Sequence, residues 1–190
     1  TLARQVADAL NILHVDSGAM YRAASLFALN NQWIENGNLN KQAFIANLEA
    51  LQVTFDLQDS SHPVLLNGED VSDRIRSMKV SEWVSEVSSI PELRKKMVEQ
   101  QRVMAARQSL VMEGRDIGTV VFPDAEVKIF LTARAEVRAK RRFDELKNKG
   151  QKVVYKKVLE NVIKRDETDS SRKSSPLRKV SDALLLDNSH

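Results

Sequence analysis

The sequence contains no cysteine, which excludes both a disulfide framework and metal sites built from thiolates. Its three histidines are scattered and do not have the spacing of zinc ligands. We therefore expect a cytoplasmic protein that holds no zinc.

Aromatic residues, long apolar runs and excess charge are also scarce. Only 5% of the residues are aromatic, which argues against a surface that stacks on bases. No uninterrupted apolar stretch approaches the roughly 20 residues that cross a bilayer, and the opening residues predict a helix rather than a signal peptide. The net charge of +3 is too small to indicate nucleic-acid binding by itself. We expect a soluble protein whose partners include neither a membrane nor a nucleic acid.

What the sequence does contain is an alternation of strand and helix patterns, over a length suited to one main domain. The alternation predicts an α/β fold, in which a parallel sheet is covered by helices in three layers. The strands predicted at 109–112, 127–133 and 182–187 are apolar enough to be buried. The predicted helices cover residues 2–10, 19–29, 91–108, 136–149 and 156–169, and a fourth, short strand covers 12–15.

The pattern changes between residues 36 and 89, which predicts an inserted subdomain. A polar turn at 36–40 precedes a predicted helix at 42–51. Strand-like segments at 53–57 and 64–67 then predict a small hairpin, whose connection is Ser-Ser-His-Pro at 60–63. The remaining segments, 1–35 and 90–190, are predicted to form the core domain.

A charged loop at 113–124 separates two of the apolar strands. It begins Glu113-Gly114-Arg115-Asp116, so an acid, an arginine and a second acid follow the end of a predicted strand. In open α/β sheets, ligands bind at the carboxyl ends of the strands. We therefore expect this loop to contribute to a ligand site.

Arginines occupy many of the loops and helix faces where a ligand would bind. A guanidinium stays charged and presents a planar fork to phosphate oxygens, so converging arginines suit a phosphorylated ligand. Any single one is more often part of a solvated helix face. The candidates are Arg22, Arg94, Arg115, Arg138, Arg141, Arg142, Arg165 and Arg172.

Two predicted helices each gather several charges on one face. Arg165, Asp169 and Arg172 have i, i+4 and i+7 spacing, which is typical of a surface ion-pair ladder. The same face could instead contact sugar hydroxyls through Asp169 and phosphate or base through the arginines. On the other helix, Arg138, Arg141 and Arg142 share a face that could close over a polyphosphate, or that is solvated or contacts nucleic acid.

A third candidate site begins at Asp16, at the end of the first predicted strand. Ser17 follows in the loop, and Tyr21 and Arg22 lie in the first turns of the next helix. Backbone N–H groups at such a helix start can bind an anion. Ser17 is also a candidate for the ordinary role of helix N-cap, and the two roles are compatible.

Together these segments resemble the bacterial cytidylate (CMP/dCMP) kinase family, a branch of the P-loop nucleoside monophosphate kinases. Three motifs match in order: DSGAMYR at 16–22, EGRDIGTVVFPDAEVKIFL at 113–131, and RDETDSSRKSSPL at 165–177. The segments at 67–76 and 80–94 resemble the family's nucleotide-binding insert, so the resemblance covers essentially the whole chain. It implies a nucleotide-binding insert at about 36–89 and a helical lid at about 134–165.

The resemblance also implies a role for each matching residue. The CMP phosphate would be bordered by Ser17, Tyr21, Arg22 and Arg115. Cytosine would be surrounded by Ser85, Arg94, Asp116 and Arg172, and the sugar would be contacted by Arg165 and Asp169. The ATP phosphates would be bound by the lid residues Arg138, Arg141 and Arg142, with Thr1 at the same site. Mg²⁺ would be oriented through water by Asp16 and Glu113.

Two features depart from the family pattern. Glu113 stands where many members have aspartate, which keeps the acid but lengthens it. The family's first strand and glycine-rich GxxxxGK[ST] loop would precede the opening helix, and the 190 residues do not contain them. We therefore expect the sequence to be incomplete at both ends, and these residues alone neither to bind ATP normally nor to catalyse transfer.

The implied reaction is reversible transfer of the ATP γ-phosphoryl group to CMP or dCMP, with Mg²⁺ and ATP, by a monomer. One alternative is another P-loop kinase with a small acceptor, such as UMP, AMP or a non-nucleotide alcohol. The size of the insert argues against shikimate-type enzymes. A different class of alternative is a non-catalytic nucleotide- or RNA-binding module, which the basic helix and the missing phosphate loop favour.

Overall fold

The protein's structure, a computed structural model, describes residues 1–56, 62–106, 108–172 and 175–189. It divides into two compact units, Thr1–Ile117 and Gly118–His190. Parallel strands and helices occur in both units, which confirms the predicted α/β class. The helices of the described residues include none that is long and apolar enough to cross a membrane.

The first unit contains a pair of parallel strands covered by a helix. Strand β1 (Leu13–Asp16) pairs in register with β7 (Leu110–Glu113), from Leu13 opposite Leu110 to Asp16 opposite Glu113. Helix α1 (Leu2–Leu10) packs against both strands. Because parallel strands end at the same edge, the pairing brings the two acids together at the carboxyl ends of β1 and β7.

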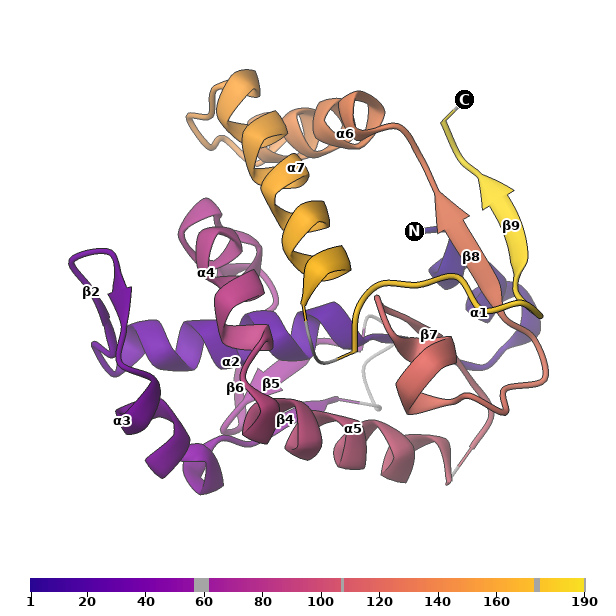
Figure 1. Cartoon of the computed structure of the whole chain (residues 1–190), viewed down its shortest axis with the longest axis horizontal. Coiled ribbons are helices and arrows are strands. Elements are labelled where there is room, and N and C mark those ends of the chain that lie inside the picture. Colours follow the sequence, from indigo (N-terminus) through magenta and orange to yellow (C-terminus); the bar gives the residue numbers. More distant parts are fainter. Residues whose placement is uncertain (57–61, 107, 173–174, 190) are drawn as a thin grey trace. The chain divides into compact units, whose positions relative to one another are not determined.

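Helix α2 (Ser17–Asn30) starts where β1 ends and forms the centre of this unit's core. It packs against α4 (Met78–Ser88) and α5 (Pro91–Ala105), as the ribbon in Figure 1 shows. Its residues are apolar on nearly all sides, and Met20, Ala23, Ala24 and Ala28 have no exposed surface. A helix with that pattern is stable only where neighbours cover it all round.

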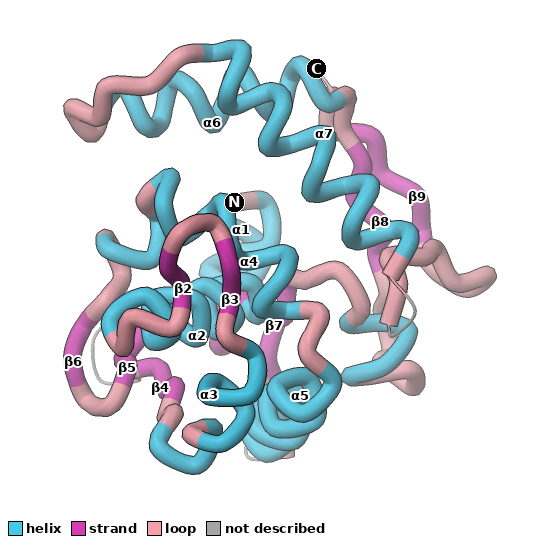
Figure 2. Tube along the Cα trace, turned by 60° about the vertical axis from the view of Figure 1, so that its left-hand side comes forward, coloured by secondary structure: helices cyan, strands magenta, loops and turns pink. Residues whose placement is uncertain are grey.

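The inserted segment forms two small antiparallel structures in the first unit (Figure 2). One is a hairpin of β2 (Ile34–Glu35) and β3 (Asn38–Leu39), and the other is a sheet of β4 (Val53–Phe55), β5 (Val64–Leu66) and β6 (Glu69–Asp70).

Asn-Gly pairs form the turns of β2–β3 and β5–β6. All four residues have positive φ, at 50° and 76° for Asn36-Gly37 and at 51° and 86° for Asn67-Gly68. Two-residue hairpin turns require this conformation, and Asn and Gly adopt it most easily. The short helices of the insert are α3 (Lys41–Ala46), η1 (Leu48–Ala50) and η2 (Arg74–Arg76).

In the second unit, two helices pack side by side and two strands pair in parallel. Helix α6 (Ala135–Asn148) packs on α7 (Tyr155–Ser171), as the orange ribbons of Figure 1 show. Strand β8 (Ile129–Thr132) pairs with β9 (Leu184–Asp187). A π-helical turn, η3 (Ile117–Val121), precedes β8 and begins at the last residue of the first unit.

Most of the predicted elements are present, with ends shifted by a few residues. The predicted polar turn at 36–40 contains the turn of the β2–β3 hairpin and strand β3, and β2 precedes it. The predicted helix at 42–51 is divided between α3 and η1. Helix α4 was not predicted. The hairpin connection predicted at 60–63 lies partly outside the described residues, and the predicted boundaries of the core, insert and lid stay predictions.

The expected burial of the late strands is wrong. Every residue of β9 is exposed, and Ile129 and Leu131 of β8 are 53% and 48% exposed. The strand predicted at 109–112, now β7, is only half-buried. An apolar strand in a parallel sheet is buried when helices cover both faces, but the two helices of the second unit pack mainly on each other.

We predict that Phe44→Ala lowers the free energy of unfolding by about 3 to 5 kcal/mol. The Phe44 ring is fully buried and lies edge-to-face with Trp33, with the ring centroids 6.1 Å apart. Chemical denaturation followed by circular dichroism measures the change. Val103→Ala is the control, because Val103 is 53% exposed and its truncation should change stability by less than about 0.5 kcal/mol. Equal effects of the two substitutions would contradict the assignment of Phe44 to the core.

Candidate active site

The carboxylate of Asp16 joins the end of β1 to the start of α2. Its Oδ1 accepts a hydrogen bond from the Ala19 backbone N–H at 3.1 Å, which makes Asp16 the N-cap of α2. Its Oδ2 accepts a hydrogen bond from Nη2 of Arg22, which lies six residues further along the chain. Both carboxylate oxygens therefore hold the beginning of α2 in position.

These contacts set the ionisation of Asp16. Burial alone would raise the pKa of the carboxyl group, but the charge of Arg22 and hydrogen bonds from Arg22 and Ala19 outweigh it. The more distant charge of Arg76 acts in the same direction, and the pKa lies below its ordinary value. Asp16 is therefore ionised at neutral pH.

The expectation that Ser17 caps α2 is wrong. Asp16 takes that role, because a carboxylate one residue earlier reaches the Ala19 N–H and interacts more strongly with the helix start. The Ser17 hydroxyl instead donates to the backbone carbonyl of Glu113 at 2.8 Å. This bond ties the first turn of α2 to the end of β7.

The guanidinium group of Arg22 has one nitrogen that is hydrogen-bonded and one that has no partner among the described residues. Nη2 binds Asp16, whereas Nε is buried and has no hydrogen-bond partner among the described residues. A buried N–H donor without an acceptor costs free energy, so an anion that accepted from Arg22 would remove that cost. The side chain is thus suited to bind an anion.

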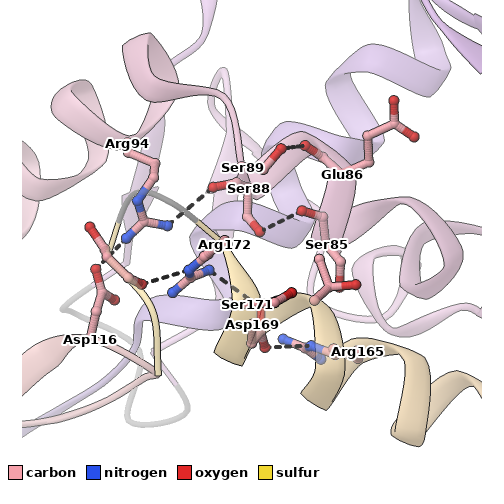
Figure 3. Close-up of polar contacts among 12 residues, drawn as sticks. Ser85, Glu86, Ser88, Ser89, Arg94, Asp116, Arg165, Asp169, Ser171 and Arg172 are labelled. Carbon is pink, nitrogen blue, oxygen red and sulfur yellow. Dashed lines mark hydrogen bonds and ion pairs between the residues drawn. The ribbon is translucent and has the colours of Figure 1, made fainter. Parts of the chain in front are cut away.

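Arg94 and Asp116 form a buried ion pair beyond the end of β7. Their side chains are 4% and 5% exposed, and Arg94 Nη2 donates to Asp116 Oδ2. Arg94 also donates to the Ser88 carbonyl at 3.1 Å, as Figure 3 shows. The Tyr21 ring lies 5.4 Å from the Arg94 guanidinium in a cation–π contact. The pair thus has the further hydrogen bonding that a buried charge requires.

The other predicted acceptor residues of the first unit are Ser85 and Arg115. Ser85 is on α4, where its carbonyl accepts from the Ser88 hydroxyl at 3.1 Å (Figure 3). Arg115 is half-buried and directly precedes Asp116. The structure thus brings Tyr21, Arg94 and Asp116 into contact, whereas the roles of Ser85 and Arg115 stay predictions.

Gly114 allows β7 to approach α2 closely. A Cβ atom at this position would lie 2.2 Å from the Ser17 hydroxyl oxygen and 2.8 Å from Cδ1 of Ile117. The first distance is far below any contact that real Cβ atoms make. Only glycine therefore permits the bond between Ser17 and the Glu113 carbonyl.

In the second unit, Arg165, Asp169 and Arg172 meet at the end of α7, as their spacing predicted. Helix α7 continues to Ser171. Arg165 Nε lies 3.7 Å from Asp169 Oδ2, and Arg172 Nη1 lies 3.3 Å from Asp169 Oδ1 (Figure 3). The Asp169 side chain is only 4% exposed. Asp169 and Arg172 are therefore buried and Arg165 is partly exposed, at 26%. The cluster is less exposed than a solvated ion-pair ladder, whose contribution to stability is small.

Two of the three predicted lid arginines, Arg138 and Arg142, bind acidic side chains of their own unit. Arg138 holds both carboxylate oxygens of Asp166 on α7, at 3.0 and 2.6 Å, and Nε donates to the Ala133 carbonyl. Arg142 pairs with Glu145 at 2.8 Å. Arg141 lines an open cleft of about 600 Å³ together with Arg134, Glu136, Val137, Lys140 and Tyr155. The three arginines thus differ in surroundings, although they share one helix face.

Glu113, the predicted Mg²⁺-side acid, accepts two hydrogen bonds on one oxygen. His14 Nε2 lies 2.8 Å from Oε1, and the Thr1 hydroxyl donates to the same oxygen at 2.9 Å. The described residues contain no cluster of three or more potential metal ligands. The role of Glu113 toward Mg²⁺ stays a prediction.

Sequence reasoning missed three residues that contact predicted site residues of their own unit. Gly114 occurs in a recognised motif, but the need for glycine depends on where Ser17 lies. Asp166 directly follows Arg165 in the motif at 165–177, and this position next to a candidate site residue is a signal that could have identified it. His14 gave no signal, because a lone histidine in a short strand has no informative spacing.

The fold and these sites define the protein as a ligand-binding α/β protein. Arginines and carboxylates gather beyond the carboxyl ends of parallel strands, where open α/β sheets bind their ligands. The chain belongs to the cytidylate kinase family, because the family model described as cytidylate kinase matches residues 1–190.

Curated relatives agree with this membership. A cytidylate kinase of Flavobacterium johnsoniae is 49% identical over 192 aligned residues, which cover 100% of this chain and 84% of the relative. A cytidylate kinase of Carboxydothermus hydrogenoformans is 48% identical, over 98% of this chain and 83% of the relative. A cytidylate kinase of Phocaeicola vulgatus is 45% identical, over 100% of this chain and 84% of the relative. The family that the motifs resembled is thus confirmed over the whole chain.

We predict that Asp16→Asn destabilises the protein by about 1 to 3 kcal/mol at neutral pH, because asparagine can still cap α2 but cannot form the ion pair with Arg22. Asp16 has a pKa of about 3.9 in the unfolded chain and a lower one in the folded state. Its contribution is therefore complete above the unfolded value and is lost as the pH falls through the folded value.

Urea unfolding between pH 7 and pH 2.5 measures this dependence. The stability difference between the unsubstituted protein and Asp16→Asn should shrink as the pH falls below about 4. Asp8→Asn is the control, since Asp8 is exposed on α1 and its substitution should have little effect at any pH. A difference for Asp16→Asn that does not change with pH would contradict the ion-pair explanation.

We also predict that Gly114→Ala destabilises the protein by about 1 to 3 kcal/mol, because the added Cβ overlaps the Ser17 hydroxyl. Ser17→Ala removes that oxygen, so the double variant should recover at least about 0.5 kcal/mol relative to the sum of the single effects. Denaturation of the four proteins gives the coupling free energy. Strict additivity would show that the Gly114 requirement has another cause.

Proposed function

We propose that the protein catalyses reversible transfer of the γ-phosphoryl group of ATP to the 5′ phosphate of CMP or dCMP. Relatives that are 45–49% identical over essentially the whole chain carry the name cytidylate kinase. The observation that carries the proposal is the buried pair of Arg94 and Asp116 beside Tyr21. It offers a fixed carboxylate and a fixed cation where the fold binds ligands.

The proposed role of Asp116 is to distinguish cytosine from uracil. A carboxylate accepts a hydrogen bond from the exocyclic amine of cytosine, whereas uracil has a carbonyl oxygen at that position. The hydrogen bond from Arg94 restrains the orientation of this carboxylate. A site built around such a contact rejects an analogue strongly, because the analogue leaves a buried polar group unpaired.

The proposed acceptor phosphate site consists of the start of α2 with Arg22 and Arg115. The unpartnered Nε of Arg22 supports this role, since a phosphate oxygen would satisfy it. Backbone N–H groups at the start of α2 also carry partial positive charge, which attracts the same phosphate. Ser17 and Tyr21 border the same helix turn and complete the predicted set.

The reaction needs no covalent enzyme intermediate. An oxygen of the CMP phosphate attacks the γ-phosphorus, a new P–O bond forms, and the bond from that phosphorus to the β–γ bridging oxygen of ATP breaks, which leaves CDP and ADP. The acceptor is already an anion, so the protein's task is to align the two nucleotides and to neutralise charge with arginines. Removal of water from the closed site prevents hydrolysis of ATP.

Mg²⁺ with ATP is the cofactor that we propose, and Glu113 is the residue that fits it best. The second oxygen of Glu113 has no hydrogen-bond donor among the described residues, so it can accept from water on the ion. Asp16 fits less well, because its two oxygens already bind Ala19 and Arg22. The ion would neutralise charge on the phosphates when bound.

For the second unit, we propose that Arg165, Asp169 and Arg172 contact the nucleoside, and that Arg138, Arg141 and Arg142 contact the ATP phosphates. Arg138 and Arg142 now bind Asp166 and Glu145. A phosphate would therefore have to exchange for these carboxylates or bind the remaining guanidinium edges. Thr1 would act at the ATP site.

We predict that the full-length protein phosphorylates CMP and dCMP at least about tenfold more efficiently than UMP or AMP, because only cytosine donates to Asp116 as proposed. A coupled assay of ADP release gives kcat/KM for each acceptor. Turnover of UMP or AMP as good as that of CMP would contradict the cytosine assignment. Retention of RNA in a salt-dependent manner without any nucleotide turnover would favour a binding module instead.

Asp116→Asn sharpens the test, because an amide can also donate to the carbonyl oxygen of uracil. The ratio of kcat/KM for CMP to that for UMP should fall by about tenfold or more. Asp124→Asn is the matched control, since Asp124 is exposed and should leave the ratio unchanged. Thermal unfolding of both variants separates a change in recognition from loss of structure.

A further inference from the structure

His14 lies on β1, two residues before Asp16, and directs its imidazole at Glu113 on the neighbouring strand. In the parallel register, His14 pairs with Val111 and Asp16 with Glu113, so His14 and Glu113 are diagonal neighbours. The distance from Nε2 to Glu113 Oε1 is 2.8 Å, and the His14 side chain is 14% exposed. Among the described residues, Glu113 is the only polar partner of the ring.

The two donors of this cluster act on the same oxygen. His14 Nε2 and the Thr1 hydroxyl both lie within 2.9 Å of Oε1, and no described residue donates to Oε2. The carboxylate is therefore held by one oxygen, while the other is available to a further partner. Both donors come from elements packed on β7, so the orientation of the carboxylate is fixed from two directions.

Glutamate needs such support more than aspartate would. Its side chain has one more rotatable bond, and each freely rotating bond spreads the carboxylate over more positions. Restraint of Oε1 removes much of that freedom before a ligand binds. Ligand-orienting partners of this kind commonly change metal affinity or activity by about 10- to 100-fold when they are removed.

We propose that His14 is a positioning residue, which holds Glu113 by Oε1 and leaves Oε2 able to accept a hydrogen bond from water on the nucleotide-bound cation. The proposal rests on the proposed function, because it assigns His14 a part in the same site. His14 itself contacts neither nucleotide nor cation; it acts through Glu113.

Three substitutions at His14 separate positioning from mere filling of space. Leucine fills a similar volume without a donor. Glutamine places an N–H donor near the position of Nε2, whereas asparagine places one near Nδ1, too short to reach Glu113. Thermal unfolding of each full-length variant identifies any that fail to fold.

In steady-state kinetics, His14→Leu and His14→Asn should lower kcat by about tenfold and raise the Mg²⁺ concentration needed for half-maximal rate at fixed ATP. The KM for CMP should change by less than about twofold, since the acceptor site does not involve His14. His14→Gln should recover most of the lost rate. Equal defects in the glutamine and leucine variants, or normal Mg²⁺ dependence in the leucine variant, would overturn the proposal.

A nitrogen NMR experiment tests the contact without turnover. In the full-length protein labelled with ¹⁵N-histidine, His14 should show a slowly exchanging proton on Nε2, and His14→Gln assigns that signal. Glu113→Leu should abolish the slow exchange. Survival of the signal in Glu113→Leu would overturn the contact. Absence of CMP phosphorylation by the unsubstituted protein would overturn the proposed function instead, and the NMR result would still decide whether His14 holds Glu113.

Discussion

The in-register pairing of β1 with β7 is the constraint on which the candidate site depends. The pairing places Asp16 and Glu113 at the same edge of the two strands, and each acid forms hydrogen bonds with a different set of residues. Asp16 fixes the start of α2 and the position of Arg22. Glu113 receives His14 and Thr1 through its side chain and Ser17 through its backbone. A shift of one residue in this register would turn the acids to opposite faces and separate these partners.

Charge in this protein is buried as matched groups rather than as single residues. Arg94 with Asp116 and Arg172 with Asp169 have side chains that are less than a tenth exposed. Each arrangement is costly to break and adds little stability over an apolar packing of the same volume. Its value therefore lies in orientation: a guanidinium or carboxylate that is already held loses less entropy when a ligand binds.

Much of this could be predicted from the sequence, for reasons that differ among residues. The spacing of Arg165, Asp169 and Arg172 fixed their common face, because helix geometry is local. The contact between Arg94 and Asp116 joins positions 22 residues apart, and only the family resemblance suggested that they share a site. The helix cap was assigned to Ser17 in place of Asp16, because both residue types suit that position. His14 and Gly114 could not be predicted, since their importance depends on the distance between strands and helix.

The late strands were expected to be buried because an apolar run indicates a preference for burial but not whether anything covers it.

The strands of the second unit expose apolar side chains, and this exposure affects how the protein behaves in solution. Ile129, Leu131, Leu184, Leu185 and Leu186 are each between 41% and 66% exposed, and Val127 beside them is 69% exposed. The two strands pair in register, with Ile129 opposite Leu184 and Leu131 opposite Leu186. Because side chains alternate along a strand, these four side chains share one face of the short parallel sheet, and Leu185 lies on the other face. Such a surface, next to a strand edge able to accept another strand, favours self-association. Residues 118–190 in isolation would therefore tend to self-associate through these strands at high concentration.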